Sequence, residues 1–155
     1  MLTFRNHSRS EGFSLLETAL AVTIITTIAA IAIPGYTECI NNAKIVRAIG
    51  DIKYIQSEID QFHLANNALP DSLEDLKMEN TTDPWGNPYQ YLAIAGAKSR
   101  GDCRKDKFLV PLNTDYDLYS MGRDGSSVPP LTAKPSRDDI VRASNGSFIG
   151  LAVNY

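Results

Sequence analysis

The sequence predicts an α+β fold in which a long N-terminal helix packs on a small antiparallel β-sheet. Three observations predict it: an apolar segment at residues 13–33, an apolar stripe of helical period at residues 45–62, and short β-prone segments separated by turn residues in the second half. The 155 residues suffice for one long helix and one modest domain, because domains cluster near about 100–150 residues.

The segment Phe13–Ile33 is long enough to cross a membrane. It has 21 residues, and its only charged residue is Glu17. About 20 apolar residues span the hydrocarbon core of a bilayer. Arg5 and Arg9 precede the segment, so the positive-inside tendency places the N-terminus in the cytoplasm. Glu17 is a functional candidate because an unpaired carboxylate in such a helix is costly; the alternative is that it lies at the interface and reaches water.

The helical pattern continues beyond the apolar segment. Pro34 and Gly35 interrupt it, since proline inside a helix kinks or breaks the helix. Apolar residues then recur every three or four positions, with charged residues on the other faces. These apolar residues are Ile45, Ile49, Ile52, Ile55, Ile59 and Phe62. The stripe predicts a helix that docks on a sheet and ends near Asn66.

The second half of the chain alternates turns with short β-prone runs. Residues 70–76 predict a short helix with Asp71 or Ser72 as N-cap, and the Asp-Pro-Trp-Gly-Asn-Pro-Tyr run at 83–89 predicts a tight turn. The expected strands cover 89–92, 108–110 and 116–120. We also expect an exposed loop at 95–106, irregular chain at 125–136, and a short helix or turn from Asp138 that precedes a last apolar run at 148–153.

The junction Gly12-Phe13-Ser14-Leu15-Leu16-Glu17 resembles the processing signature of type IV pilins and type II secretion pseudopilins. In that family a short cationic leader ends in glycine, and a phenylalanine, three small or apolar residues, a glutamate and a long apolar helix follow. The resemblance implies that a prepilin peptidase cuts after Gly12 and methylates the amine of Phe13. It also implies that Glu17 pairs with the Phe13 amine of a neighbouring subunit, and that Pro34 marks a bend or local melting of the helix in a filament.

Two later segments are similar to the paired signature of the major pseudopilin (G component) of type II secretion. They are Asp-Pro-Trp-Gly-Asn-Pro-Tyr-Gln-Tyr at 83–91 and Tyr-Asp-Leu-Tyr-Ser-Met-Gly-Arg-Asp-Gly at 116–125. The resemblance implies a pilin fold and a homopolymeric filament. It further implies four kinds of partner: minor pseudopilins, the prepilin peptidase, an inner-membrane assembly platform and a cytoplasmic ATPase.

The family also implies a calcium ion in the C-terminal loop, where carboxylate and carbonyl oxygens suit this cation. The candidate ligands are Asp124, one of Asp138 and Asp139, the backbone oxygens of Leu118 and Ser120, and, less strongly, Asp117. The spacing does not match an EF-hand. A longer connection, 126–137, stands where the family has a Gly-Gly-rich loop. The alternative is that these acids are solvated or paired with neighbouring arginines.

Composition and motifs argue against several other classes. The net charge of −3 is a poor match to nucleic acid, which requires a basic surface. His7 and His63 are poorly placed for catalysis, no serine or cysteine has an evident base partner, and no zinc or phosphate-loop motif occurs. Cys39 and Cys103 permit one disulfide in an oxidising compartment, although one follows the membrane segment and the other lies in a polar loop. We therefore expect no enzyme.

The sequence thus predicts four regions: a cleaved leader at 1–12, a membrane-spanning and filament-core helix at 13–33, its amphipathic continuation at 34–66, and a periplasmic β-rich domain at 67–155. The expected function is that of a structural pseudopilus subunit, anchored in the bacterial inner membrane by a single span, which drives protein export across the outer membrane. Two alternatives stay open. One is a type IV pilus subunit for adhesion, motility or DNA uptake, and the other is an uncut, membrane-anchored periplasmic binding module.

Overall fold

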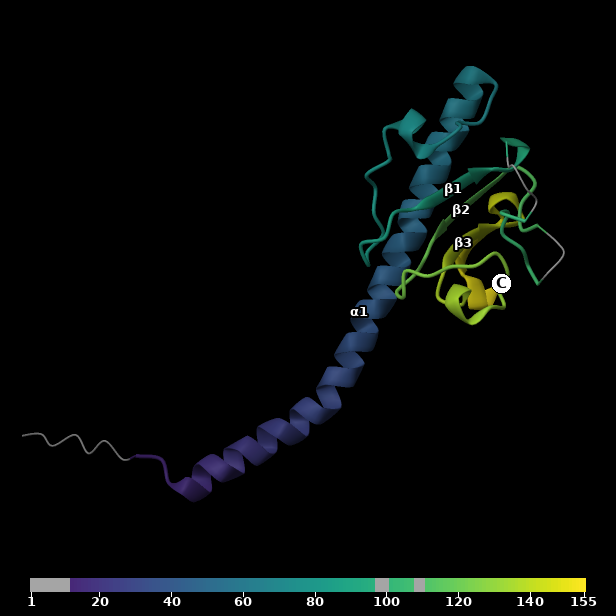
Figure 1. Cartoon of the computed structure of the whole chain (residues 1–155). Coiled ribbons are helices and arrows are strands. Elements are labelled where there is room, and N and C mark those ends of the chain that lie inside the picture. The colour runs from purple at the N-terminus through teal and green to yellow at the C-terminus, as the bar shows by residue number, and fades with distance from the viewer. Residues whose placement is uncertain (1–11, 97–100, 108–110) are drawn as a thin grey trace, which may run out of the picture. The chain divides into compact units, whose positions relative to one another are not determined.

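The computed structural model describes residues 12–96, 101–107 and 111–155 (Figure 1). The described chain divides into two units, one ending at Ile40 and the other covering Asn41–Tyr155. The predicted strand at 108–110 and the leader residues 1–11 lie outside the described residues.

Helix α1 (Leu15–Asn66) starts at a side-chain cap. The hydroxyl of Ser14 accepts the backbone N–H of Glu17 at 3.2 Å. Glu17 therefore lies in the first turn, where its negative charge interacts favourably with the positive end of the helix dipole. The helix is continuous through Pro34, so the interruption expected at Pro34 and Gly35 does not occur. The threonine hydroxyls of the first unit donate to carbonyls three or four residues earlier, as Thr23 does to Ala19 at 2.8 Å.

Four strands form one antiparallel sheet in the order β1-β2-β3-β4. They are β1 (Gln90–Ala93), β2 (Tyr116–Ser120), β3 (Ile140–Ala143) and β4 (Phe148–Leu151). In the register, Tyr91 lies opposite Leu118, Tyr119 opposite Val141, and Val141 opposite Gly150. Each strand pairs with the next along the chain, so the sheet is a simple meander.

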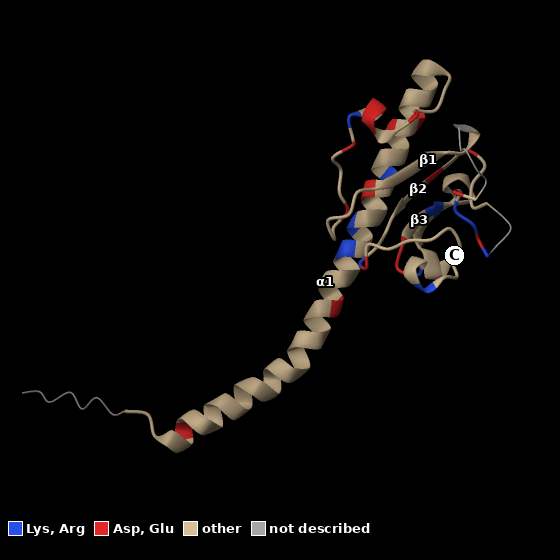
Figure 2. Cartoon of the chain, viewed as in Figure 1, with Lys and Arg blue, Asp and Glu red and all other residues tan. Residues whose placement is uncertain are grey.

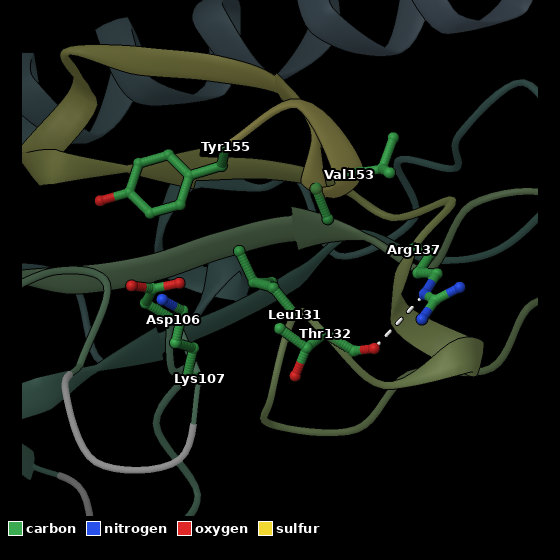
Figure 3. A pocket seen from close by; sticks show the side chains of 8 residues that line it. Asp106, Lys107, Leu131, Thr132, Arg137, Val153 and Tyr155 are labelled. Atoms are coloured by element: carbon green, nitrogen blue, oxygen red, sulfur yellow. Dashed lines mark hydrogen bonds between the residues drawn. The ribbon is translucent and has the colours of Figure 1, made fainter.

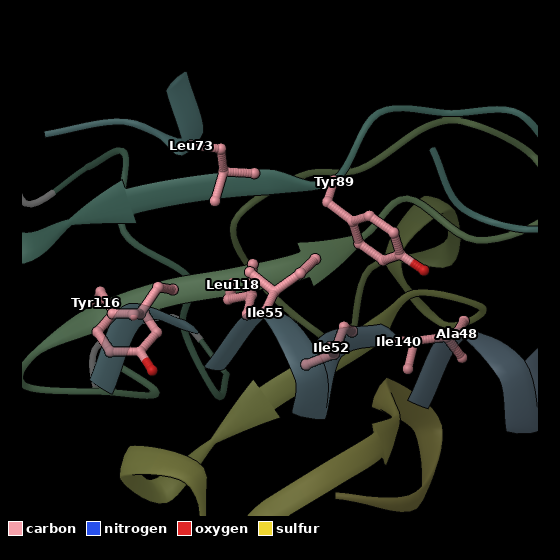
Figure 4. Packing of buried hydrophobic residues seen from close by; sticks show 9 residues of the cluster. Ala48, Ile52, Ile55, Leu73, Tyr89, Tyr116, Leu118 and Ile140 are labelled. Carbon is pink, nitrogen blue, oxygen red and sulfur yellow. The ribbon is translucent and has the colours of Figure 1, made fainter. Parts of the chain in front are cut away.

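The second part of α1 packs on this sheet through the predicted stripe. Ile52, Ile55 and Ile59 are completely buried and join Leu118 of β2 and Ile140 of β3 in one apolar cluster, shown in Figure 4. Ile45 and Ile49 are partly buried at its edge. The predicted α+β layout, a long helix on a small antiparallel sheet, is confirmed.

Short 3₁₀ helices connect these elements. They cover Leu73–Leu76, Ile94–Gly96, Lys134–Ser136, Ser144–Gly146 and Ala152–Asn154. The predicted capped helix at 70–76 is confirmed as the first of them, with Ser72 as N-cap and the carboxylate of Asp75 accepting the backbone N–H of Ser72.

Two sequence predictions for the second unit were wrong. Strand β3 lies where we expected a short helix or turn, because Arg142 breaks the apolar run although its side chain is buried within the sheet. The segment at 95–106 was expected to be exposed, yet Cys103 and Arg104 are only 2% and 3% exposed. Both errors come from reading a basic side chain as a surface residue.

Candidate functional site

The start of α1 carries the residues of the predicted processing and pairing site. Phe13 is 81% exposed, Glu17 is exposed, and Gly12 lies immediately before them. Figure 2 shows a single acidic (red) position at the beginning of α1, followed by a long uncharged (tan) stretch of the helix. In the sequence, Glu17 is the one charged residue from Phe13 to Thr37. Its backbone N–H donates to Ser14, and within the described residues its carboxylate has no hydrogen bond or ion pair, so it is available to a partner outside this chain.

The first unit presents an apolar surface with almost nothing packed on it. Its large side chains are exposed: Leu15, Leu16, Leu20, Val22, Ile24, Ile25, Ile28, Ile31, Ile33 and Tyr36. Among the described residues, α1 is the one helix long and apolar enough to cross a membrane. Because its threonine hydroxyls bond to the helix's own backbone, it also offers few unsatisfied polar groups to lipid.

The two signature segments of the second unit are joined by the carboxylate of Asp83. This side chain is 4% exposed. One oxygen accepts the backbone N–H groups of Trp85 and Asn87 at 3.0 and 2.8 Å, and the other accepts the hydroxyl of Ser120 at 2.6 Å. Asp83 therefore shapes the turn and fastens it to the end of β2.

A second link connects the same segments through Asn87. Its amide donates to the carbonyl of Gly122 at 2.9 Å. Gly122 has a φ of +65°, and a Cβ there would lie 2.3 Å from the carbonyl oxygen of Asp138, so a larger residue is excluded. The two segments that resemble one family signature therefore form one physical contact in this chain.

The predicted calcium ligands fall into two separate groups. Asp138 accepts the backbone N–H groups of Arg123 and Asp124 at 2.9 and 3.1 Å, and the carboxylate of Asp124 accepts the N–H of Ser126. These acids thus brace the turn after β2. Asp124 is exposed and Asp138 is partly exposed.

The second group surrounds Arg104. The carboxylate of Asp139 is fully buried and forms an ion pair with the guanidinium of Arg104, while its oxygen also accepts the hydroxyl of Ser127 at 2.6 Å. Asp117 accepts the backbone N–H of Arg104 at 2.6 Å and the amide of Asn113 at 2.9 Å. Burial raises the pKa of Asp139 to about 6 against the opposing effects of Ser127 and Arg104, and burial likewise raises the pKa of Asp117.

These residues do not fit a calcium centre. The carboxylates of Asp117, Asp124, Asp138 and Asp139 all accept N–H donors, and those of Asp138 and Asp139 belong to different clusters. The predicted backbone ligands, Leu118 and Ser120, lie in β2, where they pair with Tyr91 and Ile140. In the described part of the chain, no three side chains of His, Cys, Asp or Glu converge as metal ligands.

A third cluster, centred on Arg142, was missed by the sequence reasoning. This side chain is 3% exposed and binds Asp115 with both terminal nitrogens, at 2.9 and 2.7 Å. Its Nε donates to Gln56 of α1 at 3.0 Å, and its guanidinium lies 3.9 Å from the centre of the Tyr116 ring. Arg142 therefore links helix α1 to the sheet, and no residue pattern near Arg142 indicates this contact.

The ionisation of Asp115 makes this cluster sensitive to acid. Burial acts to raise the pKa of Asp115, but the hydrogen bonds from Arg142 and Tyr116 and the charge of Arg142 outweigh it, so the pKa lies below its ordinary 3.8. Stabilisation from a lowered carboxyl pKa is present above the ordinary value and is lost as the pH falls through the folded-state value.

We therefore expect Asp115→Asn to destabilise the folded chain most at neutral pH, with the difference from wild type shrinking below about pH 4. Urea unfolding, followed by the fluorescence of Trp85, the one tryptophan, measures both chains across this range. Asp102→Asn, at an exposed position, is the matched control. A difference between Asp115→Asn and wild type that stays constant from pH 7 to pH 3 would contradict the assignment.

A shallow cavity of about 420 Å³ lies beside the C-terminus (Figure 3). Its lining comprises Asp106, Lys107, Leu131, Thr132, Arg137, Ala152, Val153 and Tyr155. Arg137 is engaged at its rim, where it donates to the carbonyl of Thr132 at 3.3 Å. Among the described lining residues, no nucleophile is hydrogen-bonded to a base, so this cavity does not support the hypothesis of an enzyme.

Comparison with known proteins finds relatives of one kind. The chain is 33% identical over 138 residues to the type II secretion system core protein G of Pseudomonas aeruginosa, covering 76% of this chain and 86% of that protein. It is 28% identical over 140 residues to the protein of the same name from Aeromonas hydrophila (77% and 87% covered) and 27% identical over 137 residues to that of Vibrio cholerae (76% and 83% covered). No family model matches the chain, and no solved structure matches it significantly.

Proposed function

Because this chain belongs to the family of type II secretion system core protein G, we propose that it is a processed, membrane-anchored pseudopilin whose copies polymerise into a periplasmic pseudopilus. The observation that carries the proposal is the exposed apolar helix that begins directly after Gly12-Phe13 and carries one acid, Glu17, in its first turn.

Before assembly, the first unit of α1 anchors the chain in the bacterial inner membrane. Its exposed aliphatic side chains suit lipid, and its threonine hydroxyls are satisfied within the helix. Arg5 and Arg9 remain on the cytoplasmic side, so the second unit lies in the periplasm. A single span of this kind keeps the subunit in the bilayer until it is extracted.

Processing prepares the helix for pairing. A prepilin peptidase cuts after Gly12 and methylates the new amine of Phe13, which leaves a cationic group one residue before the Ser14 cap. An amine at a helix N-terminus is unfavourable for the helix dipole, and a carboxylate from a neighbouring subunit relieves it. Glu17 of that neighbour is the acid available within the apolar segment.

Polymerisation then replaces lipid with protein. Apolar helices that leave the bilayer must be buried elsewhere, and packing against copies of themselves removes the same aliphatic surface from water. The pair between Glu17 and the Phe13 amine fixes the axial register of these copies. Pro34, which lacks a backbone N–H, is the position at which the helix bends or locally melts in the filament.

The second unit supplies a rigid body rather than a catalyst. Its buried polar groups, such as Asp83, join loops to the sheet, and we assign it no reaction. The polymer would contact minor pseudopilins and an inner-membrane assembly platform, with a cytoplasmic ATPase supplying the energy. The proposed output is protein export across the outer membrane.

Deleting the gene tests this output against the pilus alternative. We expect the deletion strain to lose exported proteins from the medium while surface fibres and twitching motility stay normal. Loss of fibres or motility with normal export would identify a type IV pilus subunit instead. Complementation with the wild-type gene is the control.

Mass spectrometry of the membrane-extracted chain tests the processing step separately. The expected N-terminus is methylated Phe13. An intact leader beginning at Met1 would exclude both filament functions and favour the uncut binding module.

A further inference from the structure

The side chain of Arg104 reaches the C-terminal loop, residues 126–139, and places a positive charge inside it. Its side chain is 3% exposed. The guanidinium forms the ion pair with Asp139 and donates to the carbonyl of Val128 at 2.6 Å and to the hydroxyl of Ser127. It also lies 4.3 Å from the centre of the Tyr119 ring on β2.

The groups that receive this guanidinium are those that would ligate a hard cation. They are a carboxylate, a hydroxyl and a backbone carbonyl, all oxygen donors of the type that calcium selects. A guanidinium also satisfies such donors, because its N–H groups form a fixed planar fork and its charge is permanent. One of these groups, Asp139, was itself a predicted calcium ligand.

The position of Arg104 in the chain lets it join three segments. Its backbone N–H binds Asp117 of β2, its side chain reaches Ser127 and Val128 in the connection that follows β2, and the same side chain reaches Asp139 at the start of β3. Arg104 thus closes the long connection between two neighbouring strands. A bound metal ion stabilises a loop by the same kind of cross-link.

We propose that Arg104 is the resident cation of the C-terminal loop and that it performs the structural role that the family resemblance assigns to calcium. The carboxylate of Asp139 is neutralised from within the chain, and the loop at 126–139 is fixed without a metal ion. Two buried atoms of this pair, Nε of Arg104 and Oδ1 of Asp139, have no hydrogen-bond partner among the described residues, so the direct contact between the two side chains is the one from a terminal nitrogen of Arg104 to Oδ2 of Asp139.

Thermal unfolding of the full chain in detergent tests the proposal, with Trp85 fluorescence reporting on the second unit. We expect the wild-type Tm to be the same in excess CaCl₂ and in EGTA. A structural calcium site at about one hundred times its Kd would instead raise Tm by roughly 10 °C. A rise of this size for the wild-type chain would overturn the proposal without reference to any variant.

The variant Arg104→Ala tests the assigned residue. Because removing one partner of a buried ion pair leaves an uncompensated charge, we expect Tm to fall by roughly 10–20 °C. Arg123→Ala, which removes an exposed arginine in the neighbouring turn, should leave Tm within roughly 2 °C of wild type. An Arg104→Ala chain as stable as Arg123→Ala would also overturn the proposal.

Arg104→Lys separates charge from geometry and guards against a variant that does not fold. Lysine keeps the positive charge but loses the planar fork, so its Tm should lie between those of wild type and Arg104→Ala. An Arg104→Ala chain whose Tm rises in calcium, as the wild type's does not, would support the view that the guanidinium occupies the cation position. A lysine chain no more stable than Arg104→Ala would contradict a role based on charge.

Discussion

Replacing Glu17 by alanine is expected to abolish filament assembly while cleavage after Gly12 continues. In the proposed polymer the Glu17 carboxylate faces the methylated Phe13 amine of a neighbour in an apolar surrounding. Removing one partner of such a buried pair costs about 3–5 kcal/mol. Subunit association should therefore weaken by roughly a hundredfold or more.

The comparison is made on cells that overproduce the chain. Sheared or pelleted filaments measure assembly, and the N-terminal mass measures processing. Glu38→Ala is the matched control, because Glu38 is the other acid among the described residues of the first unit and is likewise exposed. Normal filaments from Glu17→Ala would refute the pairing role. An uncleaved Glu17→Ala chain would move the role of this residue from assembly to recognition by the peptidase.

Glu17→Gln tests whether the charge of Glu17, rather than the size of its side chain, is what assembly requires. Glutamine preserves the size of the side chain and its place in the first turn but carries no charge. We expect it to fail in assembly like alanine, because a neutral amide does not compensate a buried amine. Filaments of normal yield from Glu17→Gln would show that hydrogen bonding, rather than charge, sets the register.

Asp83→Ala is expected to cause the largest loss of stability in the second unit outside the Arg104 cluster. Its carboxylate accepts hydrogen bonds from Trp85, Asn87 and Ser120, and it is almost completely buried. Without it, these donors lose their acceptor inside the protein. Since hydrogen bonds to a charged group contribute about 1.5–3 kcal/mol each and are not additive, we expect a loss of about 3 kcal/mol in the free energy of unfolding.

Urea unfolding in detergent, read from Trp85 fluorescence, measures this loss. Asp124→Ala is the control within the same signature pair, because Asp124 is exposed and its carboxylate accepts one N–H, from Ser126. The control should change the unfolding free energy by less than about 1 kcal/mol. Equal effects of the two substitutions would contradict the view that Asp83 holds the signature segments together.

Much of the fold could be predicted because its signals are local. The stripe from Ile45 to Ile59 repeats at the helical period, and that repeat alone fixes which face of α1 meets the sheet. The turn at 83–89 was predicted from proline, glycine and asparagine, which set their own backbone angles. Its partner was not predicted, because the contact of Asp83 with Ser120 spans 37 positions in the chain.

The candidate site divides in the same way. Gly12, Phe13 and Glu17 were predicted from a short string that resembles the family's processing signature, in which an acid interrupts an apolar segment. The calcium ligands were inferred from the types of residue present. Residue type does not reveal whether the guanidinium of an arginine already contacts those oxygen atoms. Arg104 and Asp139 are 35 positions apart, and the residues on either side of each do not indicate that the two side chains pair.

The sequence by itself thus determined the long apolar segment, the face of the long helix that meets the sheet and the position of the tight turn, since each depends on residues within a few positions of one another. The processing junction stays a prediction. Only the tertiary structure decided that Arg104 and Arg142 are buried, that residues 140–143 form a strand and that the predicted calcium ligands belong to separate clusters. The physical reason is that a charged side chain can be buried only where a partner neutralises it, and that partner is brought by the fold from a distant part of the chain.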